Sequence, residues 1–357
     1  MDVILAIYAG FVIFGSFAHL IRLDYWWIRI WDFPHLQLAI MGAIGLTAYV
    51  VAGYAGNWGG LWIPVGLAAG LGYQSWLIYP YTPLKPVQVP RFKRIKQEKD
   101  RVEANSIRIL TANVYMYNTH MPEVKSLVNR YEPDIVMVLE ANNAWKSALE
   151  PIEETYPYRI LMPLENTYGM LFYSKLPIRK DELRFLIQDD IPSIYTQVQL
   201  PSGVWVNFYG VHPMPPSPTE HYRSTERDAE LVLVGREARK KTGPVIVAGD
   251  LNDVAWSHTT RLFQRLSGLF DPRIGRGLYS TFHARYFFVR WPLDHIFVSH
   301  HFQLLALKKL PNCGSDHFPI LATFMYAPDP ARLDDRPEPE GDDLEEAREK
   351  VEKARED

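Results

Sequence analysis

The feature that most constrains this chain is a long charge-free stretch near its N-terminus. No Asp, Glu, Lys or Arg occurs from Phe33 to Leu84, and Val3 to Ile21 also carries no full charge. A helix needs roughly 20 apolar residues to cross the hydrocarbon core of a bilayer. The longer stretch can hold two such helices, with the glycine-rich residues 53–60 as the turn between them. We therefore expect a transmembrane region over residues 1–84, with helices at about 3–22, 36–55 and 61–80. A buried helical hairpin of a soluble fold is the alternative.

The residues that flank these helices bear on membrane topology. Residues 25–31, YWWIRIW, are typical of an aromatic belt at a membrane interface. The basic run at residues 85–101 holds seven Lys or Arg and two Asp or Glu. Because cytoplasmic loops are enriched in Lys and Arg, this run predicts that the rest of the chain lies in the cytoplasm. The same run can instead be a solvated tether, so we describe residues 85–104 as a basic linker.

The middle of the chain has no net charge. Residues 102–327 hold 23 basic and 23 acidic side chains. A protein that gains its affinity mainly from phosphate contacts usually presents a basic surface. The balance therefore weakens nucleic acid as the default partner without excluding it. The single cysteine, Cys313, rules out an internal disulfide and a cysteine-based zinc site within one chain.

Short apolar segments punctuated by turns predict that strands dominate this middle region. Apolar residues at helical spacing predict helices at 121–131 and 225–241, the second ended by Gly243 and Pro244. This mixture favours an α/β fold in which packed sheets are flanked by helices. The segments that we expect to form strands are residues 106–114, 134–142, 169–174, 193–200, 204–212, 245–250, 293–299 and 320–326.

The C-terminal residues 328–357 form an acidic tail. They hold 13 acidic and six basic side chains. Residues 342–357 have the composition of a charged helix, but they offer almost nothing apolar to pack against a core. We therefore expect the tail to be disordered.

Polar side chains stand at the ends of several predicted strands. One such residue alone is more often a turn or cap residue. Together they supply carboxylates, amides and imidazoles, which is the set needed to hold Mg²⁺ against a phosphate. The sequence has neither a GxxxxGK[ST] loop nor an HExxH motif. The residues at the strand ends are Asn113, Glu140, His212, Asp250, Asn252, Asp294, Asp316 and His317.

The motifs around these residues resemble the endonuclease/exonuclease/phosphatase superfamily. TANV, VLEAN, VHP, GDLND, LDHIF and GSDH follow one another in the superfamily's order within residues 105–327, and GDLND and GSDH are the most specific of them. The superfamily includes apurinic endonucleases, pancreatic-type deoxyribonucleases, neutral sphingomyelinases and inositol polyphosphate phosphatases. The resemblance implies a deoxyribonuclease-like, four-layer β-sandwich flanked by helices. The N-terminal region is similar to that of membrane-anchored bacterial members with three transmembrane helices.

The resemblance implies the roles of the residues that hold the metal and activate water. Glu140 would bind a divalent metal, Mg²⁺ or in its place Mn²⁺, with Asn113 and Asp316 beside it. Asp250 would orient and deprotonate the attacking water, and Asn252 would hold a phosphoryl oxygen. Phosphoryl transfer of this kind depends on positioning and charge neutralisation more than on covalent help.

The resemblance also implies how the scissile phosphate is held. His212 and His317 would contact it, and Asp294 would pair with His317. Two positions depart from the family pattern: Leu139 replaces a glutamine, and Pro292 replaces an arginine. Neither change removes a catalytic group, so we expect an active metal-dependent phosphodiesterase.

Candidate substrate-binding residues lie outside the motifs. Lys175 occupies a family position that often holds arginine. Residues 278–291, LYSTFHARYFFVRW, are aromatic and basic and directly precede the strand of Asp294. Tyr279 and Arg285 in this segment are our candidates for contacts to headgroups or to bases. The alternative is a β-hairpin whose aromatic residues are buried.

The sequence leaves the substrate open between a nucleic acid and a membrane phospholipid. A lipid bilayer is the other expected partner, and no protein partner is expected. An inactive membrane-anchored binding protein on the same fold is the alternative function. A calcineurin-like phosphoesterase lacks support, because its DxH and GNH motifs are absent. We expect a multi-pass protein of the cell (inner) membrane. The charges place the catalytic domain in the cytoplasm, whereas the resemblance places it outside.

Overall fold

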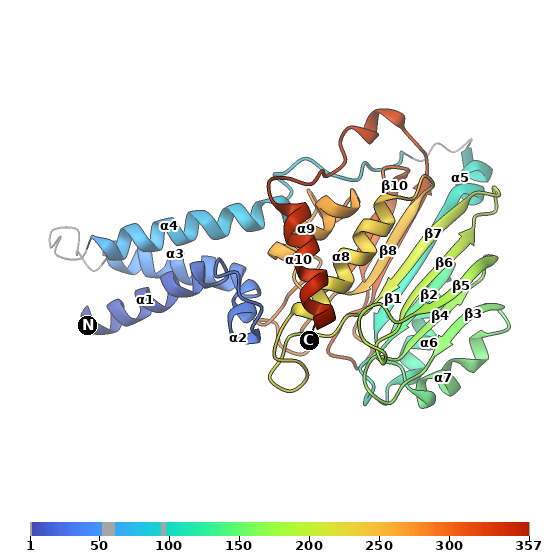
Figure 1. Ribbon diagram of the computed structural model, residues 1–357, viewed down its shortest axis with the longest axis horizontal. Helices are drawn as coiled ribbons and strands as arrows, with labels where there is room; N and C mark the ends of the chain where they lie inside the picture. The colour runs from blue at the N-terminus through green and yellow to red at the C-terminus, as the bar shows by residue number, and fades with distance from the viewer. Residues whose placement is uncertain (1, 52–60, 94–97, 357) are drawn as a thin grey trace.

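The computed structural model describes residues 2–51, 61–93 and 98–356, and it consists of a helical bundle that projects from a larger body of sheets and helices (Figure 1). The bundle contains α1 (Asp2–Ala18), α3 (His35–Val51) and α4 (Trp62–Ile78), which pack against one another. The short α2 (Trp26–Arg29) and the 3-10 turn η1 (Ile30–Asp32) connect α1 to α3.

Helices occupy all three segments in which the sequence predicts them, and each of the three has 17 residues. Within the described ranges, no single helix is long and apolar enough to cross a membrane. One pair, residues 26–32 and α3, meets the length and composition criteria together, with a bend of 69° between its parts. The predicted turn at residues 53–60 and the end of the predicted helix 36–55 lie outside the described residues.

Two mixed sheets form the body. The first sheet has the order β10-β11-β1-β2-β4-β3, with β10 (Phe302–Lys309), β11 (Ile320–Tyr326), β1 (Ser106–Asn113), β2 (Ile135–Leu139), β4 (Met170–Ser174) and β3 (Tyr158–Met162). The second sheet has the order β5-β6-β7-β8-β9, with β5 (Ile178–Arg184), β6 (Ser193–Gln199), β7 (Trp205–Val211), β8 (Val245–Asp250) and β9 (Asp294–Val298).

Helices cover the outer faces of both sheets, so the body has four layers. The inner faces meet in one core that contains Met137 and Phe172 from the first sheet and Phe208 and Ile246 from the second. The first sheet carries α6 (Met121–Tyr131), α7 (Asn143–Leu149) and the 3-10 turn η6 (Glu150–Ile152) on its outer face, and the second carries α8 (Thr225–Arg239) and α9 (His258–Ser267). Because both faces of the central strands are covered, β2, β4 and β8 are buried at every residue. The predicted α/β sandwich is confirmed.

The sequence analysis missed three strands, β3, β5 and β10. The β5 sequence IRKDELR carries five charged residues, and all seven residues are half-buried or exposed. Such an edge strand lacks the apolar pattern that identifies a strand. β3 is likewise an edge strand, with Tyr158 and Arg159 exposed.

The predicted disorder of residues 328–357 is wrong. Residues 330–333 form the 3-10 turn η7 (Pro330–Leu333), and Asp343–Glu356 form α10, which packs on α8. The buried apolar residues of α10 are just two, Ala347 and Val351. Ion pairs supply most of the other contacts, including Lys350 with Asp228 at 2.8 Å and Arg265 with Asp343 at 2.6 Å. The apolar pattern of α10 was therefore too sparse to predict its docking.

The basic linker predicted over residues 85–104 is not a free tether where the structure describes it. Val89 is fully buried in the core between the sheets, and Arg91 pairs with Leu304 beside β10. The short helix α5 (Lys99–Asn105) leads directly into β1. Residues 86–90, PVQVP, thus continue the packed body, and the lysines and arginines in the described part of the linker are exposed on its surface.

Hydrogen bonds join the helical bundle to the body. Trp256 Nε1 donates to the carbonyl of Asp32 at 2.7 Å. Tyr81, which ends the 3-10 turn η4 (Tyr79–Tyr81), donates its hydroxyl to the carbonyl of Ala255 at 2.6 Å. Ala255 and Trp256 lie only a few residues beyond Asp250, so the bundle is anchored next to the end of β8.

Candidate active site

The polar residues predicted at strand ends converge at one edge of the sandwich. β1 runs parallel to β2 in the first sheet, and β7 runs parallel to β8 in the second. A hydrogen bond from Asn113, the last residue of β1, to Asp250, the last residue of β8, brings the carboxyl ends of these strands together. The antiparallel β9 begins at this edge, where its first residue pairs with the last residue of β8. The residues brought together are Asn113, Glu140, His212, Asp250, Asp294 and His317.

Unusual backbone conformations position Asp250, Glu140 and Asn252. Gly249 has φ +152°, and a Cβ there would lie 1.8 Å from the carbonyl oxygen of Val211, so only glycine fits. This close approach brings Asp250 against β7. Glu140 and Asn252 have φ of 56° and 49°, a left-handed conformation that is costly for non-glycine residues. Such conformations concentrate at functional sites, because the surrounding structure must hold them.

His317 lies between two buried carboxylates. Its Nδ1 donates to Asp294 Oδ2 at 2.8 Å, and its Nε2 lies 3.5 Å from Asp250 Oδ2. Burial alone would lower the pKa of His317, but Asp294 and Asp250 together raise it to about 10. The ring is therefore an imidazolium at neutral pH, available to stabilise negative charge that develops on a phosphate.

Asn113 joins the predicted metal residue to the predicted base. Its Nδ2 donates to Glu140 Oε1 at 2.8 Å and to Asp250 Oδ2 at 3.1 Å. Its Oδ1 accepts from the backbone N–H of Tyr115 at 3.1 Å. Asn113 was predicted to lie at the metal, beside Glu140. In the structure its amide group bridges Glu140 and Asp250 and orients both carboxylates.

The charges at the site fit a bound divalent cation. Burial raises the pKa of Glu140 to about 7; the Asn113 hydrogen bond and His317 oppose this rise, and Asp316 and Asp250 add to it. Four carboxylates, those of Glu140, Asp250, Asp294 and Asp316, surround the single imidazolium of His317. Carboxylate oxygens are the preferred ligands of Mg²⁺. Glu140 would hold the ion, with Asp316, whose carboxylate is half-exposed, at the open side.

Three of these residues place their ligand atoms within 4.8 Å of one another: Asp250, Asp294 and His317. Geometry of this kind also suits a metal. However, both ring nitrogens of His317 face carboxylates, and a ring that holds two protons cannot bind a metal. We therefore assign this group to proton binding and orientation, and the ion to the side of Glu140.

His212 is buried and differs from His317 in its charge. Burial lowers the pKa of His212 to about 4, although Asp250 opposes the shift, so the ring is neutral at pH 7. Its Nδ1 is buried and has no hydrogen-bond partner among the described residues. A neutral ring with a free nitrogen suits a hydrogen bond to a bound phosphate.

Asn252 lies at the turn after Asp250. Its backbone N–H donates to Asp250 Oδ1 at 2.9 Å, and its Nδ2 donates to the carbonyl of Pro213 at 2.9 Å. The buried Arg227 donates to the carbonyl of Asn252 at 2.9 Å and so fixes the turn. The second N–H of the Asn252 amide remains available for a phosphoryl oxygen.

The structure places Lys175 away from the site, which contradicts its predicted substrate contact. β4 is antiparallel to β2, so residue 175 follows the strand that ends beside Ile135, the first residue of β2. Glu140 follows the other end of β2. The strand of five residues separates them by about 16 Å. Lys175 instead lies over the ring of Tyr156 at 5.2 Å.

The segment 278–291 borders the site. The ring of Phe282 lies 5.0 Å from that of His317, and Phe282 pairs with Trp291. Tyr279 lines a hollow beside the site, and the exposed Arg285 reaches the carbonyl of Gly314 at 3.5 Å. The alternative of a hairpin with buried aromatics is wrong for its tip, because Tyr286, Phe287 and Phe288 are exposed.

Other residues that position the site were not predicted. Ser315 Oγ donates to the carbonyl of Asn113 at 2.8 Å and accepts from the N–H of His317 at 3.0 Å. Tyr168 lies 5.6 Å from the ring of His212 and donates its hydroxyl to Glu220. Ser315 lies inside the GSDH motif, which is the signal that could have identified it. No sequence signal identifies Tyr168, because it lies in a loop.

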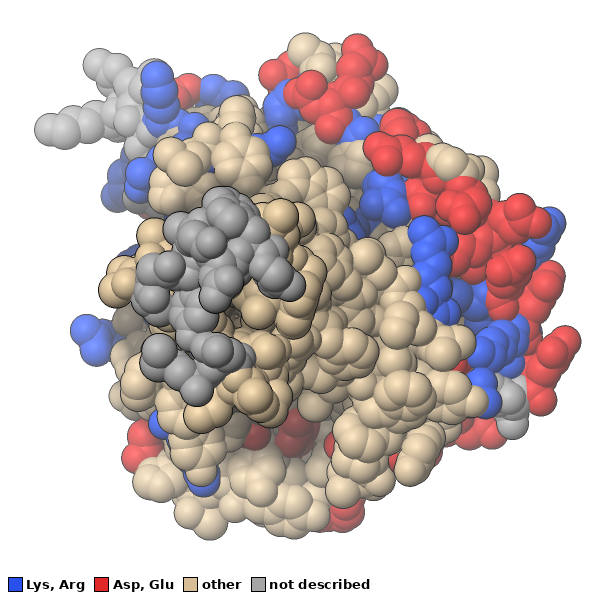
Figure 2. Space-filling model, turned by 90° about the vertical axis from the view of Figure 1, so that its left-hand side faces the viewer, with Lys and Arg blue, Asp and Glu red and all other residues tan. Residues whose placement is uncertain are grey.

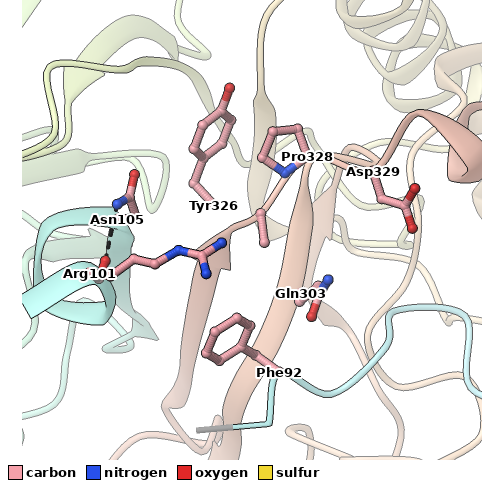
Figure 3. A pocket seen from close by; sticks show the side chains of 8 residues that line it. Phe92, Arg101, Asn105, Gln303, Tyr326, Pro328 and Asp329 are labelled. Carbon is pink, nitrogen blue, oxygen red and sulfur yellow. Dashed lines mark hydrogen bonds between the residues drawn. The ribbon is translucent and has the colours of Figure 1, made fainter. Parts of the chain in front are cut away.

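A separate hollow of about 450 Å³ lies at the opposite edge of the first sheet (Figure 3). Arg101, Phe92 and Tyr326 surround it, and Asn105 donates to the carbonyl of Arg101 at 3.0 Å. It lies beside the first residue of β1, whereas Asn113 is the last. The hollow is therefore remote from the candidate catalytic residues.

Comparison with known proteins gives a family match and several similar folds. Residues 110–317 match the model of the Endonuclease/Exonuclease/phosphatase family. A structure of D. rerio TDP2 complexed with a single-strand DNA product has 20% identity and a TM-score of 0.50, over 61% of this chain and 98% of that one. An endonuclease/exonuclease/phosphatase protein from Bacteroides vulgatus has 17% identity and a TM-score of 0.50, over 62% of this chain and 99% of that one. The human Nocturnin catalytic domain has 16% identity and a TM-score of 0.50, over 62% of this chain and 95% of that one. No curated protein matches the chain.

Proposed function

The chain belongs to the Endonuclease/Exonuclease/phosphatase family and is a metal-dependent hydrolase of the phosphodiesterase and nuclease type; from this premise we propose that it is a membrane-attached enzyme that cleaves a phosphodiester in a membrane phospholipid. The observation that carries the proposal is the contact of the site-bordering segment 278–291 with the start of α3. Gln37 on α3 donates to the carbonyl of Phe288 at 2.9 Å, and the rings of Phe33 and Trp291 lie 5.3 Å apart. The site thus opens beside the helices that would enter the bilayer.

The chain's own side chains would activate water and stabilise the transition state. Asp250 accepts the proton of the attacking water and is held in place by Asn113. The imidazolium of His317 and the neutral ring of His212 donate to the phosphoryl oxygens as charge develops on them. Asn252 orients the phosphate. When bound, Mg²⁺ supplies Lewis-acid polarisation and charge neutralisation, with Mn²⁺ as its substitute.

Membrane attachment is proposed from the surface of the bundle. The outward faces of the helices expose large apolar side chains, which a soluble surface rarely gathers in one place. Figure 2 views this end of the molecule: its central surface is mostly uncharged, whereas acidic and basic side chains gather at the top and along the right-hand side. Apart from Asp2, α1, α3 and α4 contain no Asp, Glu, Lys or Arg. The exposed apolar residues of the bundle include Val3, Ile4, Ile7, Phe11, Phe14, Ile40, Ile44, Val51, Trp62 and Val65.

A nuclease is the second candidate. The exposed Tyr286, Phe287 and Phe288 are also suited to stack on unpaired bases. The D. rerio structure with single-strand DNA is that of a protein with the same fold. Against this candidate stands the absence of net charge in residues 102–327, since non-specific nucleic-acid binding depends on cationic contacts.

An assay on the full chain separates these candidates. The protein, reconstituted in phosphatidylcholine nanodiscs with Mg²⁺, is offered fluorescent phosphatidylglycerol in the disc or a labelled single-stranded oligonucleotide in solution. Asp250→Asn serves as the control for contaminating activity. We expect loss of the lipid label with the wild type alone. Cleavage of the oligonucleotide alone makes the enzyme a nuclease, and silence on both substrates revives the inactive binding protein.

Two features bear on the side of the membrane at which the catalytic domain lies. The basic run at residues 85–101 supports a cytoplasmic domain, and the similarity to membrane-anchored bacterial members supports an external one. We propose attachment to the cell (inner) membrane by several helices. Alkaline phosphatase fused after residue 104 distinguishes the sides, because it is active only outside the cytoplasm.

A further inference from the structure

A large hollow lies where the helical bundle meets the catalytic body. Its volume is about 880 Å³, which falls within the size range of ligand-binding cavities. One wall is the first two turns of α3, and the other is the region around the segment 278–291 and the end of β10. The residues that line it are Leu36, Gln37, Ile40, Met41, Arg276, Gly277, Tyr279, Ser280, Phe287, Phe288, Arg290 and Lys309.

Three cationic side chains line the hollow, and no carboxylate from the described part of the chain lines it. Arg290 has a buried Nε without a hydrogen-bond partner among the described residues. The Arg290 guanidinium and Lys309 Nζ lie 5.1 and 4.4 Å from the ring centre of Phe318. Arg276 donates only to backbone carbonyls, among them that of Pro272 at 2.9 Å. None of the three cations forms an ion pair with a described carboxylate.

Cations that have no carboxylate partner favour the binding of an anion. A partly buried cation has lost part of its hydration, and a phosphate restores both charge balance and hydrogen bonds. Burial lowers the pKa of Lys309, and the nearby Arg290 lowers it further, as expected of positive charges that face no negative one. Arg290 and Lys309, which line the same hollow, are thus suited to bind an anionic group.

The wall of α3 is apolar and continues beyond the hollow. Ile40 and Met41 line the hollow itself. Ile40, Ile44 and Val51 are 53%, 59% and 79% exposed, and their spacing of four and seven residues places them on one face of α3. An apolar stripe therefore leads from the cationic hollow along the bundle, away from the catalytic body.

We propose that the hollow binds the headgroup of an anionic phospholipid, with the acyl chains along the stripe of Ile40, Ile44 and Val51. An anionic head and an apolar tail are the two features that the hollow and the stripe complement. The inference rests on the membrane attachment proposed above. It does not rest on the substrate, because the catalytic side chains do not line the hollow. A lipid bound there would hold the segment 278–291, and with it Phe282 beside His317, at a fixed depth relative to the bilayer.

The test measures lipid binding without catalysis. Full-length Asp250→Asn protein in a neutral detergent is mixed with dioleoyl phosphatidylglycerol or dioleoyl phosphatidylcholine, and retained lipid is counted by native mass spectrometry. We expect phosphatidylglycerol to be retained in preference to phosphatidylcholine. The added changes Arg290→Gln and Lys309→Gln should reduce the retained phosphatidylglycerol at least about fivefold, since each removes a charge-assisted hydrogen bond. Phosphatidylcholine retention should not change.

A matched control removes the same charges elsewhere. Arg130 and Lys146 are exposed on α6 and α7, on the outer face of the first sheet. Arg130→Gln with Lys146→Gln should leave phosphatidylglycerol retention unchanged, and melting curves of all variants establish that each is folded. Should Arg290→Gln with Lys309→Gln not fold, Ile40→Asn with Ile44→Asn tests the apolar stripe in the same assay.

Three outcomes overturn the inference. One is equal retention of the two lipids, and another is loss of retention in the Arg130 and Lys146 control to the same extent. The third is retention of neither lipid, together with binding of a single-stranded oligonucleotide that depends on Arg290 and Lys309. That result would make the hollow part of a nucleic-acid path. Because the Asp250→Asn protein is used throughout, failure here leaves the proposed hydrolysis untouched. Failure of the hydrolysis assay likewise leaves the lipid site standing.

Discussion

Asp294 accepts a hydrogen bond of 2.8 Å from His317, and this contact joins the first residue of β9 to a loop that precedes β11 in the other sheet. A charged hydrogen bond thus links the two sheets at this edge of the sandwich. Both residues are buried. The contact maintains an imidazolium where the phosphate would bind.

Replacement of Asp294 should alter the charge of His317. Asp294→Asn removes the carboxylate that contributes most to the raised pKa of His317. We expect kcat to fall about 100-fold, as is typical when one group that stabilises a transition state is lost. Because activity needs the protonated ring, the alkaline limb of the pH–rate profile should move to lower pH. An unchanged profile with a reduced rate would show that Asp294 acts only through structure.

Glu140 should set the requirement for metal. Glu140→Gln removes the charge that would hold the ion, so half-maximal activity should need at least about tenfold more Mg²⁺. The control is Glu123→Gln, an exposed carboxylate on α6. A Mg²⁺ titration that Glu140→Gln does not shift would remove Glu140 from the metal site.

Glu230 on α8 should make stability depend on pH. It is buried, its Oε1 has no described partner, and burial raises its pKa to about 8. The folded protein therefore keeps a proton that the unfolded chain releases above about pH 4.5. Stability should fall by up to about 1.4 kcal/mol per pH unit between the two pKa values, and Glu230→Gln should remove this slope. Melting temperatures from pH 5 to 8 measure it, and equal slopes would contradict the assignment.

The C-terminal helix should contribute to stability through its ion pairs. Burial would raise the pKa of Asp228, but Lys350 and then Arg227 hold it below its usual value. Lys350→Ala leaves the buried carboxylate with one partner fewer and should destabilise the protein by about 2 kcal/mol. Glu352→Ala, which changes an exposed residue of the same helix, is the control. Equal melting temperatures for both variants would show that α10 is only loosely attached.

The sequence predicted the parts of the fold that have both an apolar pattern and polar strand ends. β1, β2, β7 and β8 are apolar runs that end at chemically distinctive residues, so their positions and the convergence of Asn113, Glu140 and Asp250 were foreseeable. β5 and α10 are held by edge pairing and ion pairs, which leave little trace in hydropathy. Their structure depends on partners that are distant in the sequence.

Side-chain direction was the least predictable aspect of the site. The motif order placed Asn113 near the metal, but only the structure shows its amide nitrogen directed at two carboxylates. Lys175 was misplaced because a strand's direction in the sheet decides which edge its last residue reaches. The hollow between α3 and Arg290 joins segments about 250 residues apart, as the bond from Gln37 to Phe288 does, and no local pattern predicts it.

The most direct test of the central claim uses a phosphodiester that needs no particular recognition. Full-length protein in a neutral detergent is incubated with bis(p-nitrophenyl) phosphate and Mg²⁺, and release of p-nitrophenol is followed for the wild type and for Asp250→Asn. We predict hydrolysis by the wild type, its loss when the ion is chelated, and a rate at least about 100-fold lower in the variant. Equal rates for the two proteins, or hydrolysis that persists without a divalent ion, would contradict the assignment of this edge of the sandwich as the active site.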